Sequence, residues 1–150
     1  SLDLTVLVAI ASAFGLGRAM QVTGLDQSFA DLAVWMGASS PMLALIAIYV
    51  LTAVLTELVT NNAAAVLAIP MAISLADRVD ASPMGFVIAV MVAASASFLS
   101  PIGYQTNLMV FNAGGYRPLD YPRLGLPMSI AAATVTLTVV PMLWPLTPAP

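Results

Sequence analysis

The sequence predicts an all-α membrane protein, and three observations support this fold class. Hydrophobic residues make up 61% of the 150 residues, and the mean hydropathy is +1.00. Charged residues make up only 7% of the chain, whereas soluble domains carry about 25%. The apolar residues gather in runs that approach the ~20 residues needed by a spanning helix.

The composition also excludes several kinds of function. The chain has no cysteine, histidine or lysine, so it cannot by itself build a disulfide, a thiolate nucleophile, a haem ligand or a zinc cluster. Its net charge of −3 comes from scattered residues, which leaves no basic patch for nucleic acid. Because the chain begins Ser1-Leu2-Asp3 and lacks the basic segment of a signal peptide, we expect it to be a piece of a longer protein.

Residues 1–40 are predicted to contain a spanning helix and an interfacial helix. Residues 4–22 are mostly apolar, and their small residues four apart would let helices approach closely. In residues 23–37, apolar side chains recur at helical spacing among polar ones, which places Trp35 at the headgroup level. A plain connecting loop is the alternative for this second stretch.

Residues 41–80 are predicted to form a helical hairpin. Ser40 and Pro41 supply an N-cap and a first-turn proline. The apolar run that follows contains one charge, Glu57, and one compact polar cluster, Thr-Asn-Asn at 60–62. Unpaired amides and carboxylates cost several kcal/mol in hydrocarbon, so we expect these side chains to face a bundle interior, a cavity or a partner.

The lengths of the two legs do not decide whether this hairpin crosses the membrane. A helix over residues 41–60 would be about 30 Å long, close to the hydrocarbon thickness. A water-exposed turn usually carries glycine, proline or several charges, whereas Thr-Asn-Asn followed by alanines is typical of a tip packed inside protein. The sequence therefore favours a re-entrant hairpin, with two complete crossings as the alternative.

Residues 81–116 are predicted to form a spanning helix that is broken near its middle. The first part begins at a Ser-Pro pair and runs to about Leu99. Pro101 lacks an N–H and Gly103 tolerates positive φ, and four polar residues (104–107, Tyr-Gln-Thr-Asn) follow before the apolar run resumes. An ordinary proline kink is the alternative, but it does not account for four consecutive polar side chains.

Residues 117–150 are predicted to form the last spanning helix, from 124 to 144, and a disordered tail. Pro127 is expected in its first turn, where proline is tolerated. The connector at 112–123 carries two arginines and one aspartate, whereas the connector at 77–80 has a net charge of −1. By the positive-inside tendency, the arginine-containing connector is cytoplasmic and the C-terminus is external.

A polar hairpin tip and a broken helix in one hydrophobic unit are typical of secondary transporters, which bind substrates and ions at such places near the membrane midplane. The helix that begins after Asn62 would point its first N–H groups at the tip, which favours an anion. The hydroxyls of Thr56 and Thr60 and the carbonyls of residues 101–103 would offer oxygen ligands to a hard cation such as sodium. One site could thus bind an anion and a coupling cation together.

These two motifs carry a resemblance to a known family. Residues 56–63 (TELVTNNA) and 101–107 (PIGYQTN) resemble the hairpin and broken-helix motifs of the divalent anion:sodium symporter family, within the ion transporter superfamily. More narrowly, the chain looks like the permease branch that carries TrkA C-terminal domains. The resemblance covers essentially all of residues 1–150. It implies that they form a single transmembrane domain, the C-terminal of two inverted repeats, completed by a missing N-terminal repeat of the same chain.

The resemblance implies sodium-coupled uptake of a divalent anion, sulfate or a small dicarboxylate, by an elevator mechanism. The transporter would be a homodimer in the cell inner membrane, in contact with lipid, with a re-entrant hairpin and no cofactor other than the coupling sodium. The resemblance assigns sodium to Thr56, the carbonyl of Val59, Asn61 and the carbonyl of Gly103. It assigns the anion to Thr60, Asn61, Asn62, Tyr104 and Asn107.

The sequence departs from the family pattern at two places. Asn62 replaces a threonine, and Tyr-Gln-Thr at 104–106 replaces Thr-Pro-Pro. The phenol of Tyr104 would remove volume from the pocket, which favours a smaller oxyanion such as sulfate over di- and tricarboxylates. Three of the four arginines lie in connectors, so anion binding would depend on hydroxyls, amides and helix ends.

Two other functions are alternatives to symport. A cation/proton or arsenite antiporter of the same superfamily needs a titratable group in its pathway, and Glu57 is the only acid deep in an apolar run. We favour the interpretation that Glu57 is a structural acid capped by neighbouring N–H groups. A non-transporting assembly subunit gives no reason for two matched helix breaks, and an enzyme such as an intramembrane protease would need a histidine, a Ser-Lys pair or a helical aspartate pair.

Overall fold

The computed structural model describes residues 4–101 and 104–147 of the chain. These residues form seven α-helices: α1 (Leu4–Thr23), α2 (Leu25–Trp35), α3 (Pro41–Leu58), α4 (Asn61–Arg78), α5 (Pro83–Ser95), α6 (Gln105–Gly114) and α7 (Asp120–Leu143). The described part contains no strand, in agreement with the predicted all-α fold.

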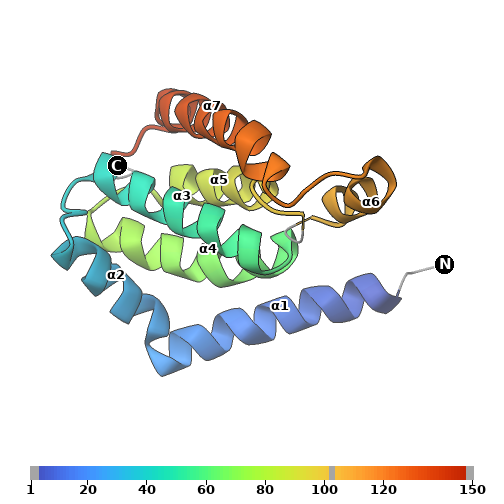
Figure 1. Ribbon diagram of the computed structural model, residues 1–150. Coiled ribbons are helices and arrows are strands. Elements are labelled where there is room, and N and C mark those ends of the chain that lie inside the picture. The colour runs from blue at the N-terminus through green and yellow to red at the C-terminus, as the bar shows by residue number, and fades with distance from the viewer. Residues whose placement is uncertain (1–3, 102–103, 148–150) are drawn as a thin grey trace.

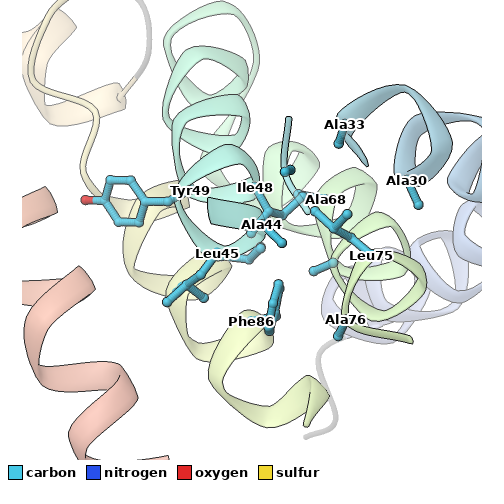
Figure 2. Close-up of a cluster of buried hydrophobic side chains, with 14 of the residues drawn as sticks. Ala30, Ala33, Ala44, Leu45, Ile48, Tyr49, Ala68, Leu75, Ala76 and Phe86 are labelled. Carbon is cyan, nitrogen blue, oxygen red and sulfur yellow. The ribbon is translucent and has the colours of Figure 1, made fainter. Parts of the chain in front are cut away.

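Helices α3, α4 and α5 pack together as the central unit of the protein (Figure 1). Helices α1 and α2 lie against α4 on one side of this unit, and α7 lies against α5 on the other. Many of the buried side chains between these helices are alanines, with Leu45, Ile48, Leu75 and Phe86 filling the remaining space (Figure 2). Small side chains let helix backbones approach closely, so the alanine-rich stretches become the inner faces of the bundle.

The predicted hairpin is confirmed in α3 and α4, and its turn consists of only Val59 and Thr60. Ser40 caps α3 through a hydrogen bond from the N–H of Leu43 (3.4 Å). The hydroxyl of Thr60 accepts the N–H of Ala63 (3.3 Å), so Thr60 is the N-cap of α4. The second helix therefore begins at Asn61, two residues earlier than the sequence predicts.

The predicted break between α5 and α6 is present, but it begins earlier and is longer than predicted. Helix α5 ends at Ser95 rather than near Leu99, and residues 96–104 separate it from α6. The carbonyl groups of Ala94 and Ser97 accept hydrogen bonds from remote side chains, and these contacts compete with continuation of the helix. We call residues 96–104 the break. Residues 102 and 103 lie outside the described residues.

The last helix is longer than predicted, which changes the position of one proline. Helix α7 begins at Asp120, because Asp120 accepts the backbone N–H of Arg117 (2.8 Å) and so stabilises the turn before it. Pro127 consequently lies in the helix interior and not in the first turn. The connector is shortened to residues 115–119, with Gly115 ending α6 at a φ of 63°.

Residues 25–35 form the predicted helix and not the alternative loop. Gly24 turns the chain between α1 and α2 with a φ of 70°, a conformation that favours glycine. Asp26 is buried against α4 and accepts a hydrogen bond from Ser74 (2.6 Å), while Asp31 pairs with Arg78 at 2.8 Å. The side chain of Trp35 is 82% exposed.

Two described helices, α3 and α7, are long and apolar enough to cross a membrane by length and composition. Helix α5 is equally apolar but has only 13 residues, so it needs the break and α6 to extend further. The chain thus combines long apolar helices with one interrupted element.

Candidate functional site

The tip of the α3–α4 hairpin meets the break after α5. Figure 1 shows the turn between α3 and α4 at the end of the central unit where the chain leaves α5 toward α6. Four hydrogen bonds join the last turn of α3 to residues 94–100. The polar hairpin tip that the sequence singled out therefore meets residues 94–100, which precede the polar residues predicted at 104–107.

Oxygen atoms converge at the buried hydroxyl of Thr56. This hydroxyl lies 2.6 Å from the carbonyl oxygen of Ala94 and 2.9 Å from Oδ1 of Asn61. A threonine hydroxyl has one proton to share between these two acceptors. Three uncharged oxygens, from Thr56, Asn61 and Ala94, thus lie close together, and oxygens of this kind are suitable ligands for a hard cation such as sodium.

The last carbonyls of α3 are also held by the break. A helix leaves its final carbonyls without partners inside the helix. The hydroxyl of Ser97 donates to the carbonyl of Thr56 (3.4 Å), and the hydroxyl of Ser100 donates to the carbonyl of Glu57 (3.4 Å). The break therefore docks onto the end of α3 in a defined register.

Glu57 binds the break through its side chain. The backbone N–H of Leu99 donates to Oε1 of Glu57 at 2.9 Å, which supports the interpretation of Glu57 as a structural acid held by a neighbouring N–H group. The other carboxylate oxygen, Oε2, is buried and has no hydrogen-bond partner within residues 4–101 and 104–147. The carboxylate thus stabilises the contact between hairpin and break while remaining half-buried.

Two of the predicted anion contacts lie on the exposed side of the tip. Thr60 and Asn62 are exposed at the N-terminal turn of α4, where backbone N–H groups and the positive end of the helix dipole favour negative charge. The hydroxyl of Thr60 accepts the N–H of Ala63 as the N-cap, and because Thr60 is exposed its proton can still be donated to a ligand. Val59 is extended beside them and is 37% exposed.

Among the described residues, no hydrogen bond joins the side chain of Tyr104 to the hairpin tip. Tyr104 precedes α6, is 48% exposed, and makes no side-chain hydrogen bond among the described residues. Gly103, the fourth predicted sodium ligand, lies outside the described residues. Asn107 is half-buried, and its Nδ2 donates to the carbonyls of Ser97 (3.0 Å) and Ser100 (3.2 Å).

Two contributing groups could not be predicted from the sequence. Residues 93–97 were expected to lie within a helix that runs to about Leu99, yet they supply the carbonyl of Ala94 at the end of α5 and the hydroxyl of Ser97 in the break. Ser97 and Ser100, two polar residues close to Pro101, were the sequence signal that could have indicated this contact with the end of α3. The role of the Ala94 carbonyl could not be predicted from the sequence, because every residue has a backbone carbonyl.

Comparison with known proteins identifies the family of this chain. The sequence profile of the citrate transporter family matches residues 1–149. The chain belongs to this family. Citrate transporter family members are membrane transport proteins, so the chain is part of a membrane protein of a transporter family and not of an enzyme family. This agrees with the predicted relation to anion:sodium symporters.

Individual relatives extend from algae to mammals. A protein of Chlamydomonas reinhardtii named "putative sulfur deprivation response regulator" is 43% identical over 139 residues, which covers 90% of this chain and 23% of the relative. The sodium/sulfate cotransporter 1 of the same alga is 41% identical over 127 residues, or 83% of this chain and 14% of the relative. Solute carrier family 13 member 2 of Mus musculus is 26% identical over 135 residues, 89% of this chain and 23% of the relative. The chain spans less than a quarter of the length of these curated relatives.

Proposed function

We propose that this chain is one repeat of a secondary transporter that couples sodium entry to the uptake of a divalent anion, with sulfate as the substrate. One observation carries the proposal, namely that a polar hairpin tip and a helix break meet around the hydroxyl of Thr56. Relatives that carry the names sodium/sulfate cotransporter 1 and 2 match this chain at 41% and 42% identity.

The cation side of the site is supported by the convergence of oxygens. Thr56 and Asn61 were predicted as sodium ligands, and their side chains are in contact. The carbonyl of Ala94 joins them at 2.6 Å from the hydroxyl. The carbonyls of Val59 and Gly103 complete the proposed ligand set. Sodium favours such uncharged oxygens, so no acidic ligand is required.

The anion side is proposed at the N-terminal end of α4. Thr60, Asn61 and Asn62 would donate hydrogen bonds to the anion, and the backbone N–H groups of the first helical turn would add their dipoles. No arginine is part of this proposal. Tyr104 would limit the size of the pocket, in favour of a compact oxyanion such as sulfate, when the missing repeat closes the site from the other side.

The assembly that we propose follows the family resemblance. The hairpin is re-entrant, because residues of the break donate hydrogen bonds to the polar groups at the end of α3. The hairpin tip therefore does not need to reach water on the opposite side of the membrane. The protein is a homodimer in the cell inner membrane and works by an elevator motion. Its C-terminus is external, because Arg117 in the connector at 115–119 and Arg123 in the first turn of α7 favour a cytoplasmic position for that end of α7.

The proposal is tested by sodium-driven uptake with a matched pair of threonine variants. The full-length protein that contains this chain is reconstituted in liposomes, and labelled sulfate uptake is followed under an imposed sodium gradient. Thr56→Val removes the hydroxyl at the site and should raise the sodium requirement about ten- to a hundredfold, the effect of losing roughly 1.5–3 kcal/mol. Asn61→Ala should abolish uptake while leaving expression and dimerisation unchanged.

Thr52→Val is the control for this experiment. Thr52 is buried one turn earlier on the same face of α3, but its hydroxyl donates only to the carbonyl of Ile48 in its own helix (2.7 Å). This variant should transport like the wild type. Uptake that a pH gradient alone drives fully, or a Thr56→Val variant with the sodium dependence of the Thr52→Val control, would overturn the proposed function.

A further inference from the structure

The side chain of Asn107 faces the break and not the hairpin tip. Its Nδ2 lies 3.0 Å from the carbonyl oxygen of Ser97 and 3.2 Å from that of Ser100. Both neighbours are acceptors, so the nitrogen and not the oxygen of the amide must face them. Both N–H donors of the amide are then in use. Only Oδ1 is left, and an anion does not approach an acceptor oxygen.

Asn107 is in turn held by the last helix. The hydroxyl of Tyr121 in α7 donates to the backbone carbonyl of Asn107 at 2.7 Å. The ring of Tyr121 also lies beside Phe111 of α6, at a centroid distance of 6.1 Å. The first turn of α6 therefore has a fixed position relative to α7.

Ser97 and Ser100 are each bound from both sides. Their carbonyls accept hydrogen bonds from Asn107, whereas their hydroxyls donate to the final carbonyls of α3, those of Thr56 and Glu57. A displacement of Asn107 would consequently move the same residues that dock the break onto the hairpin. The carbonyl of Ala94, three residues before Ser97, would be displaced with them.

We propose that Asn107 is a positioning residue for the sodium site, with Tyr121 fixing it from α7, rather than a contact to the anion. The inference rests on the proposed function, since it takes the convergence at Thr56 to be the sodium site. It assigns a role in cation binding to residues that do not touch the cation. It also links the site to α7, a helix to which the sequence analysis gave no part in binding.

The test measures two quantities separately: sodium binding in the absence of transport, and the KM for sulfate. Sodium-dependent stabilisation of the purified full-length protein gives the sodium concentration for half-maximal effect, since a ligand that binds only the folded state raises its stability. Sulfate KM is measured in liposomes at saturating sodium. Tyr121→Phe removes one hydrogen bond and should raise the half-maximal sodium concentration about two- to tenfold. Asn107→Leu, which removes both donors at similar volume, should raise it further.

Tyr116→Phe is the matched control. The ring of Tyr116 lies beside that of Tyr121, at a centroid distance of 6.3 Å, but its hydroxyl makes no hydrogen bond to the described residues. This variant should keep the wild-type sodium dependence. The mild Tyr121→Phe change keeps the inference testable if Asn107→Leu does not fold.

Each outcome separates the inference from its alternatives. A raised sodium requirement with unchanged sulfate KM supports the positioning role. A changed sulfate KM with unchanged sodium stabilisation overturns it and makes Asn107 an anion contact. A loss of stability in sodium-free buffer with unchanged half-maximal sodium also overturns it, because the contacts would then be merely structural. If the wild type shows neither stabilisation by sodium nor sodium-driven uptake, the proposed function fails and the inference with it.

Discussion

Gly125 offers a direct test of whether the position of the break controls the site. Gly125 is buried in α7, and a Cβ built at this residue would overlap the backbone carbonyl of Phe98 and lie 3.1 Å from the Phe98 Cβ. Backbone cannot rotate away as a side chain can, so Gly125→Ala must push the break away from α7. Overpacking of this kind costs about 1–3 kcal/mol, against a gain of up to about 1 kcal/mol in helix propensity. Because the overlap is with backbone, we place the cost at about 2–3 kcal/mol, and after the gain of about 1 kcal/mol the variant should lose about 1–2 kcal/mol.

The consequence for binding follows from the next residue. Ser97 precedes Phe98 and joins the break to the end of α3, so its displacement weakens the site at Thr56. If Gly125→Ala destabilises only the sodium-bound state, by the full ~1–2 kcal/mol, the half-maximal sodium concentration rises about five- to thirtyfold. The assays are thermal unfolding of the purified full-length protein with and without sodium, and sodium-driven sulfate uptake in liposomes.

Gly15→Ala is the control for Gly125→Ala. A Cβ at Gly15 in α1 meets none of the described atoms within 4 Å, so the same substitution should stabilise α1 by up to about 1 kcal/mol without changing sodium dependence. A Gly125→Ala protein that unfolds at or above the wild-type temperature and transports normally would refute the steric argument.

Two further substitutions test the anion side and the coupling ion. Tyr104→Thr should enlarge the proposed pocket and shift preference from sulfate toward succinate-sized dicarboxylates, as measured by competition of both anions against labelled sulfate; an unchanged ranking would mean that Tyr104 points away from the anion. Glu57→Gln should keep most sodium-driven uptake, because an amide oxygen can still accept the N–H of Leu99. Glu57→Leu should lose this uptake. An inactive Glu57→Gln protein, together with wild-type uptake driven by a pH gradient, would favour the antiporter.

Much of the hairpin could be predicted because its signals are local. A Ser-Pro pair starts α3, Thr60 caps α4, and the apolar runs between them are uninterrupted except at Glu57. Caps and runs act within a few residues of themselves, so the sequence shows them directly. The error of two residues at the start of α4 arose because Thr60 was interpreted as a ligand and not as an N-cap.

The end of α5 could not be predicted in the same way. Ala93 to Ser97 are acceptable helix residues, and nothing in the local sequence ends the helix at Ser95. The helix ends there because the hydroxyl of Thr56, 38 residues away in the sequence, donates to the carbonyl of Ala94. The hydroxyl of Ser97 in turn donates to the carbonyl of Thr56. Similarly, the family resemblance predicts Asn107 as an anion contact, and only the structure shows that its amide donates to two carbonyls of the break.

The sequence by itself determined that this is a helical membrane protein with a polar hairpin tip and one broken helix, because composition, caps and prolines act locally. It also determined the family resemblance, because the two motifs are made of side chains. The tertiary structure alone decided which backbone carbonyls meet the hairpin and which element holds the break in place. Every residue carries the same carbonyl group, so its use depends on which remote donor is packed against it.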